Sequence, residues 1–135
     1  MITAVDTNVL LDIFGADLRF GTRSADALRR CLEEGALCAC EVVWAETVSL
    51  FPDSGACLKA MHAIGVDFSP MTRDAALKAA DAWRRYRAKG GKRDRVVADF
   101  LIGSHALSQC DRLLTSDRGF YREYFGRLRV IDPSA

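Results

Sequence analysis

The feature of this sequence that most constrains its fold is a carboxylate at the point where a short apolar run changes to a helical pattern. Residues 2–5 (Ile-Thr-Ala-Val) are too few for a helix and too apolar for an exposed strand, which favours a central parallel strand covered on both faces. From Asn8 onward the apolar residues recur at helical spacing. Asp6 is therefore expected at the carboxyl end of a strand, where open α/β sheets bind ligands. The alternative is that Asp6 serves only as the N-cap of the helix.

Further short apolar runs alternate with amphipathic segments along the rest of the chain. They predict strands at residues 36–40, 66–68, 112–115 and 128–131, with helices between them. This alternation is typical of an α/β fold, here a three-layer α/β/α sandwich with a central, mainly parallel sheet and right-handed connections. The length of 135 residues, half of them hydrophobic, suits a single domain over residues 1–135.

The sequence contains no uncharged run long enough to cross a membrane and no basic-then-apolar leader at its N-terminus. We therefore expect a soluble, cytoplasmic protein. Its cysteines lack the paired spacing of a zinc site, so we interpret them as reduced thiols that pack in the interior. His62 and His105 have no partner at ligand spacing and are expected at the surface or in the core. The cysteines are Cys31, Cys38, Cys40, Cys57 and Cys110.

Four acidic residues occupy matching places in this predicted topology. Asp6 and Asp117 directly follow strands, Glu46 lies in the helix after the second strand, and Asp99 lies early in a helix that is apolar nearly all round. All four side chains can reach the same edge of a parallel sheet. Thr115 ends the strand before Asp117 and could orient it or a water molecule, although a threonine also suits a strand for structural reasons.

Four carboxylates at one edge need a cation. Two of them about 4 Å apart repel each other by roughly 4 kcal/mol at an effective dielectric constant of 20, so the group stays ionised only if a metal is bound. Oxygen ligands without Cys or His select Mg²⁺ or Mn²⁺. The chemistry that such a site supports is hydrolysis of phosphodiester bonds by metal-activated water.

The net charge of +1 hides a strongly basic segment. Seven of the twelve residues from 84 to 95 are Lys or Arg, interrupted by a double glycine. One interpretation is a solvated helix end, because basic residues favour the last helical turn. The excess of charge favours a second interpretation, in which the segment binds the phosphates of a nucleic acid. We expect Lys92, Arg93 and Arg95 to make these contacts.

Four motifs in order carry a resemblance to a known family. They are V-D-T-N-V-L-L-D at residues 5–12, V-V-W-A-E at 42–46, D-F-L-I-G-S-H-A at 99–106 and L-L-T-S-D-R-G-F-Y at 113–121. Together they span most of the chain and resemble PIN-domain ribonucleases, in particular the VapC-like toxins of bacterial toxin–antitoxin modules.

The resemblance implies an endoribonuclease that cleaves RNA with Mg²⁺ or Mn²⁺. Its acidic metal site would consist of Asp6, Glu46, Asp99 and Asp117, supported by Asn8 and Thr115. The implied partners are a cognate antitoxin protein and a second copy of the chain in a homodimer.

Two rival functions use similar strand-end acids. A haloacid-dehalogenase-like phosphatase also begins with a strand and an Asp, but its second Asp would fall at Asn8. A phospho-receiver domain requires an early acid pair and a strand-end lysine, and neither is evident. A third alternative is a catalytically silent module of the same fold that binds RNA or protein.

The segment around Glu46 has more apolar residues than one buried helix face requires. Some of them are expected to face outward and form a groove for an amphipathic antitoxin helix, whose arginine would pair with the acids. The alternative is that they fill the core against the following helix. The residues concerned are Val42, Val43, Trp44, Val48, Leu50, Phe51, Ala56, Leu58 and Met61.

Overall fold

The computed structural model describes residues 1–91 and 97–134. Five strands form one sheet in the order β3-β2-β1-β4-β5, and every neighbouring pair is parallel. Each strand expected from the sequence is present. The strands are β1 (Ile2–Val5), β2 (Ala36–Ala39), β3 (Val66–Phe68), β4 (Arg112–Leu114) and β5 (Val130–Ile131).

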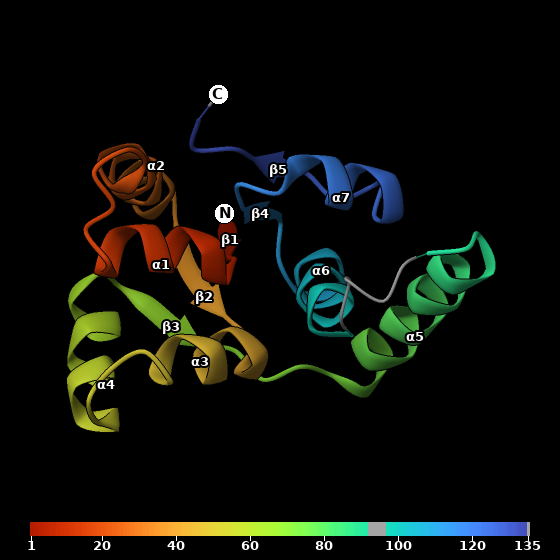
Figure 1. The fold of residues 1–135 in the computed structure, drawn as a ribbon, viewed down its shortest axis with the longest axis horizontal. Coiled ribbons are helices and arrows are strands. Elements are labelled where there is room, and N and C mark those ends of the chain that lie inside the picture. Colours follow the sequence, from red (N-terminus) through yellow and green to blue (C-terminus); the bar gives the residue numbers. More distant parts are fainter. Residues whose placement is uncertain (92–96, 135) are drawn as a thin grey trace.

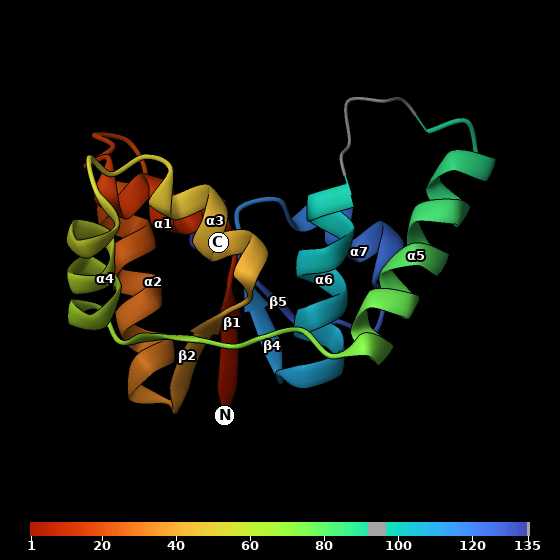
Figure 2. The ribbon, with the colours of Figure 1, turned by 90° about the horizontal axis from the view of Figure 1, so that it is seen from below.

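Helices cover both faces of this sheet. Figure 2 shows the strands between α2 and α4 on one side and α5, α6 and α7 on the other, so the predicted three-layer α/β/α arrangement is confirmed. The sheet is parallel throughout. The helices are α1 (Thr7–Phe14), α2 (Gly21–Glu33), α3 (Glu41–Val48), α4 (Ser54–Ala63), α5 (Arg73–Ala88), α6 (Val97–Gln109) and α7 (Arg118–Tyr124).

Strand β1 lies at the centre of the sheet, as its apolar composition predicts. Ala4 pairs with Cys38 of β2 on one side and with Leu113 of β4 on the other, and all three residues are buried. Strand β3 lies at the edge of the sheet, which agrees with Pro70 shortly after it. Because all strands run the same way, their carboxyl ends meet at one edge of the sheet.

Helix α6 is the buried helix that the sequence predicts, and it packs most extensively against α5 (Figure 1). Phe100 of α6 is completely buried and makes edge-on ring contacts with Trp83 and Phe120. At Gly103 an added Cβ would lie 2.6 Å from the ring of Phe125, so only glycine allows this close approach. This packing fixes the position of Asp99 in the first turn of α6.

No helix within residues 1–91 and 97–134 combines the length and the apolar character needed to cross a membrane.

Candidate active site

Asp6 lies at the junction of β1 and α1, and its carboxylate is the centre of a buried hydrogen-bond network. It is the N-cap residue of α1, and its Oδ1 accepts a bond of 2.7 Å from the backbone N–H of Thr7. Its Oδ2 accepts bonds from the Thr115 hydroxyl at 2.7 Å, the Tyr121 hydroxyl at 3.1 Å and the Asn8 amide at 3.4 Å. Asp6 therefore does serve as the N-cap of α1, but it also accepts hydrogen bonds from side chains of two segments that are distant in the sequence.

The parallel pairing of β1 with β4 explains why Asp6 meets Thr115. Val5 is in register with Leu114, and the backbone N–H of Asp6 donates to the carbonyl of Leu114 at 2.9 Å. Asp6 directly follows β1 and Thr115 directly follows β4, so these two residues lie side by side at the carboxyl edge of the sheet.

Burial raises the pKa values of both Asp6 and Tyr121. Asp6 is only 5% exposed, and burial raises its pKa from 3.8 to about 6, although the bonds from Thr115, Thr7 and Tyr121 favour the ionised form. The charge of Asp99 raises this pKa further. Burial, and then the charges of Asp6 and Asp99, also raise the pKa of Tyr121. Tyr121 consequently stays a neutral phenol that donates to the carboxylate.

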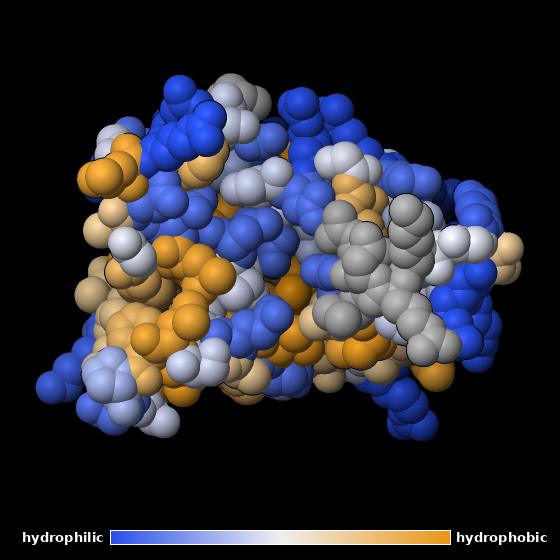
Figure 3. Space-filling view, in the orientation of Figure 1, coloured by the Kyte–Doolittle hydropathy of each residue, from blue (hydrophilic) through white to orange (hydrophobic). Residues whose placement is uncertain are grey.

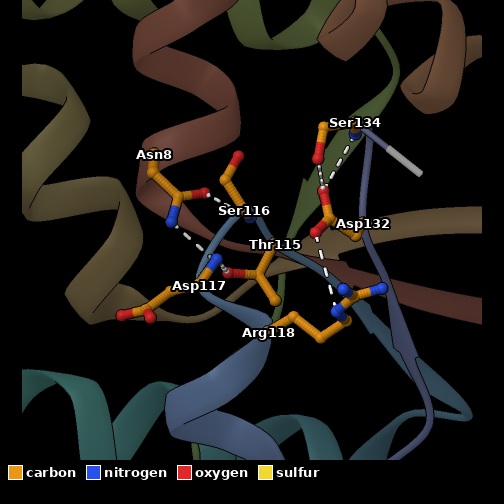
Figure 4. Close-up of polar contacts among 7 residues, drawn as sticks. All are labelled: Asn8, Thr115, Ser116, Asp117, Arg118, Asp132 and Ser134. Atoms are coloured by element: carbon orange, nitrogen blue, oxygen red, sulfur yellow. Dashed lines mark hydrogen bonds and ion pairs between the residues drawn. The ribbon is translucent and has the colours of Figure 1, made fainter.

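Thr115 also organises the turn that carries Asp117 (Figure 4). Its hydroxyl oxygen accepts a bond from the backbone N–H of Asp117 at 3.0 Å and one from the Asn8 amide at 3.3 Å. The Asn8 carbonyl oxygen accepts the backbone N–H of Ser116 at 3.2 Å. In Figure 4 the carboxylate of Asp117 points away from Asn8 and Thr115. It is half-buried, and its charge acts on Tyr121.

Glu46 and Asp99 approach the same region from two helices. Glu46 is exposed on α3, and its Oε1 accepts a bond of 2.7 Å from the hydroxyl of Thr7, the residue next to Asp6. Asp99 is half-buried in the first turn of α6 and lies close enough for its charge to raise the pKa values of Asp6 and Tyr121. Each of the other three acids is thus linked to Asp6 through a shared neighbour or through its charge.

The four carboxylates are nevertheless spread more widely than the ligands of one bound cation. Among the described residues, one group of three or more Asp, Glu, His or Cys side chains has all its ligand atoms within 4.8 Å of one another, and it contains none of these four acids. For all four to bind one cation, these side chains must move closer together.

Two residues of the network could not be identified from sequence patterns. Tyr121 belongs to an aromatic run whose spacing indicates only packing, and the donation of its hydroxyl to Asp6 depends on the placement of α7. Thr7 follows Asp6 directly but carries no signal of its contact with Glu46. Lys92, Arg93 and Arg95 lie outside the described residues.

The structure places His105 in the core, one of the two places expected from the sequence, beside partners that the sequence spacing did not indicate. His105 is buried on α6 and its Nε2 lies 3.0 Å from the hydroxyl oxygen of Ser69. A ring nitrogen of His105 also lies within 4.8 Å of the sulfurs of Cys38 and Cys110. The separation in sequence between residues 38 and 105 concealed this group. All five cysteines are free thiols, as expected.

Replacing Thr115 with Val is expected to destabilise the protein by about 1–3 kcal/mol at neutral pH. The substitution keeps the shape of the side chain but removes the hydroxyl that donates to Asp6 and accepts from Asp117. Denaturant unfolding measures the effect. Thr115→Ser keeps the hydroxyl and is expected to retain most of the stability; equal stability of the Val variant and the wild type would contradict the role given to this bond.

Comparisons with known proteins place this geometry in a family. No curated protein sequence matches the chain. Solved structures do match over nearly its whole length. VapBC-1 from nontypeable Haemophilus influenzae aligns over 100% of both chains, with a TM-score of 0.77 and 15% identity. VapBC2 from Rickettsia felis, bound to a promoter DNA fragment, aligns over 98% of both chains, with a TM-score of 0.74 and 17% identity.

A toxin–antitoxin complex from Klebsiella pneumoniae aligns over 97% of both chains, with a TM-score of 0.66 and 17% identity. At these identities the similarity demonstrates the fold. A family model supplies the classification, because the model of the PIN domain matches residues 3–126. The chain therefore belongs to the PIN domain family.

Proposed function

We propose that this protein is an endoribonuclease that depends on Mg²⁺ or Mn²⁺ and acts as the toxin of a toxin–antitoxin pair. Membership of the PIN family and the toxin–antitoxin complex among the similar structures support this proposal. The observation that carries it is the buried carboxylate of Asp6 at the carboxyl edge of the sheet, within reach of the charge of Asp99.

Asp6, Glu46, Asp99 and Asp117 would hold the cation. The fit rests on the chemistry of the donors, because all are carboxylate oxygens, which suit hard cations such as Mg²⁺ and Mn²⁺. Asp6 is the acid that most needs a cation. Keeping a carboxylate ionised when it is only 5% exposed costs free energy unless a positive charge compensates it. When bound, the cation would supply activation of water and stabilisation of negative charge on the phosphate.

The remaining residues of the site would orient its carboxylates. Thr115 and Tyr121 hold one oxygen of Asp6, and Thr7 holds one oxygen of Glu46. Asn8 bonds both Thr115 and Ser116. Its neutral amide cannot serve as the general acid that a haloacid-dehalogenase-like phosphatase needs at this position, which favours the nuclease over that rival.

The basic segment would bind the phosphates of the RNA. Changing Lys92, Arg93 and Arg95 to Gln is expected to weaken RNA binding and to reduce the slope of log affinity against log salt concentration by about 2, at roughly 0.7 per lost single-strand phosphate contact. Binding is measured without divalent cations, so that no cleavage occurs.

Three exposed arginines of α2 provide a matched control for charge alone. Changing Arg23, Arg29 and Arg30 to Gln removes the same net charge from α2 and is expected to change the salt slope much less. An unchanged slope in the variant of residues 92, 93 and 95 would return that segment to the interpretation as a solvated helix end.

The proposed antitoxin would bind the apolar surface over α3 and α4. In Figure 3 hydrophobic side chains gather at the lower left, where these helices lie in Figure 1. Leu50 and Leu58 are 63% and 57% exposed, whereas Val43 and Met61 are buried, so the apolar surplus is divided between core and surface. A groove of about 410 Å³ is lined by Trp44, Leu58 and Phe68, among others.

An amphipathic helix would place its apolar side chains in this groove. An arginine of the partner would pair with the acids and compete with the cation. We further propose that the protein forms a homodimer and acts in the cytoplasm, where its RNA substrate is found.

Induced expression tests the proposed function. Expression of the wild type is expected to arrest growth and to create new RNA 5′ ends at a recurring sequence, because free toxin cleaves cellular RNA. Co-expression with the neighbouring open reading frame is expected to restore growth and to yield a co-purifying complex. Active, non-toxic protein that ignores this neighbour would contradict the antitoxin proposal and leave the nuclease proposal intact.

A further inference from the structure

Three side chains from separate segments converge on the face of the sheet that α6 covers. Cys38 lies in β2, His105 in α6, and Cys110 directly after α6. Their ligand atoms all lie within 4.8 Å of one another, and the two sulfurs are 3.4 Å apart. Cys38 and His105 are buried, and Cys110 is half-buried. The described part of the chain holds no other group of Cys, His, Asp or Glu side chains this compact.

We propose that Cys38, His105 and Cys110 bind one Zn²⁺ ion, at a site distinct from the four acids. Two thiolates and an imidazole are a ligand set that Zn²⁺ takes with a fourth position left for water or another group. Two thiolates also neutralise a divalent cation, so the loaded site carries no net charge in the interior. Mg²⁺ and Mn²⁺ prefer oxygen ligands, so the two sites would select different metals.

The two sulfurs need little adjustment to accept this ion. Zn–S bonds of about 2.3 Å in a tetrahedral site place two sulfurs about 3.8 Å apart, and Zn–N bonds of about 2.0–2.1 Å place sulfur and nitrogen about 3.6 Å apart. The sulfurs would separate by a few tenths of an ångström from 3.4 Å. The hydroxyl of Ser69, 3.0 Å from Nε2 of His105, is available to orient the ring or to bond a fourth ligand.

The proposed ion would connect β2 to both ends of the segment from His105 to Cys110. Helix α6 also carries Asp99, six residues before His105, or about 9 Å along the helix axis. Binding is therefore expected to fix α6 against the sheet and to raise the thermal stability of the protein, without contributing to the acidic site.

Cobalt serves as the probe, since Co²⁺ replaces Zn²⁺ and reports its ligands by absorption. The full chain is reduced, its five thiols are counted, and Co²⁺ is added. We expect one equivalent to produce a thiolate-to-cobalt charge-transfer band and the visible bands of a tetrahedral site. Zn²⁺ should remove these bands and excess Mg²⁺ should not. Carboxylates give no such charge-transfer band, so binding at the acidic site is not mistaken for it.

Cysteine variants locate the site. Cys38→Ser and Cys110→Ser are expected to lose the band, whereas Cys57→Ala, which changes a buried cysteine outside the group, should keep it. Thermal unfolding without metal shows whether each variant is folded. On the wild type, Zn²⁺ should slow alkylation of Cys110 at least tenfold and Mg²⁺ should not. A fully reduced wild type without the band, a band that survives in both Ser variants, or unprotected Cys110 would overturn the proposal.

Discussion

Replacing Asp99 with Asn is expected to reduce RNA cleavage by at least about 10³-fold while leaving the fold as stable as before. A bound divalent cation contributes several kcal/mol of charge stabilisation to phosphodiester hydrolysis, and each 1.4 kcal/mol corresponds to a factor of ten in rate. The substitution removes a proposed ligand. It also removes a charge that adds to the effect of burial in raising the pKa of Asp6. Cleavage of a defined RNA and thermal melting without metal are the measurements.

Asp74→Asn is the matched control. Asp74 occupies the first turn of α5, as Asp99 does in the neighbouring α6, but its side chain is exposed. The control is expected to keep full activity. Retained cleavage by Asp99→Asn would exclude Asp99 from the site, and a collapsed melting transition would give it a structural role instead.

The second large effect concerns pH. Because burial raises the pKa of Asp6 from 3.8 to about 6, the unfolded chain releases this proton at a lower pH than the folded protein does. The contribution of Asp6 to stability is therefore greatest below about pH 4, falls as the pH rises, and levels off above about pH 6.5. The total loss is about 3 kcal/mol, or roughly 10 °C in melting temperature.

Other groups titrate in the same pH range, so the contribution of Asp6 is measured as the difference in unfolding free energy between the wild type and a variant that lacks this carboxylate. Burial lowers the pKa of His105, which acts in the opposite direction as the pH rises. The unfolding free energy of the wild type minus that of Asp6→Asn, measured with a chelator present, isolates the contribution of Asp6. This difference should fall between pH 4 and pH 7. Saturating Mg²⁺ should restore more stability at pH 8 than at pH 5, since binding requires the ionised carboxylate. A flat difference would contradict the burial assigned to Asp6.

Much of the fold could be predicted because local patterns and sheet topology agree. The apolar run before Asp6 is a central strand, Thr72 caps a long helix by accepting the N–H of Ala75, and Gly65 follows α4 at a φ of 78°. Once the strands are parallel, their ends share an edge, so Asp6 and Thr115 become neighbours. This contact follows from register and needs no knowledge of side-chain conformation.

The remaining contacts could not be predicted because they depend on how helices pack. Tyr121 reaches Asp6 only through the placement of α7, and Cys38 meets His105 only through the placement of α6. Residues of this kind have no spacing signal in the sequence. The sequence therefore indicated the four acids as candidate ligands and gave no signal of the group formed by Cys38, His105 and Cys110.

The most direct test of the central claim is cleavage of a labelled RNA and of a DNA of the same sequence by the purified chain. Each is incubated with a chelator, with Mg²⁺ and with Mn²⁺, and Asp6→Asn is run in parallel. The proposed function predicts that the wild type cuts the RNA only when Mg²⁺ or Mn²⁺ is present, and that Asp6→Asn leaves it intact. Cleavage that persists in the chelator, or an RNA that is bound and never cut with either ion, would contradict it.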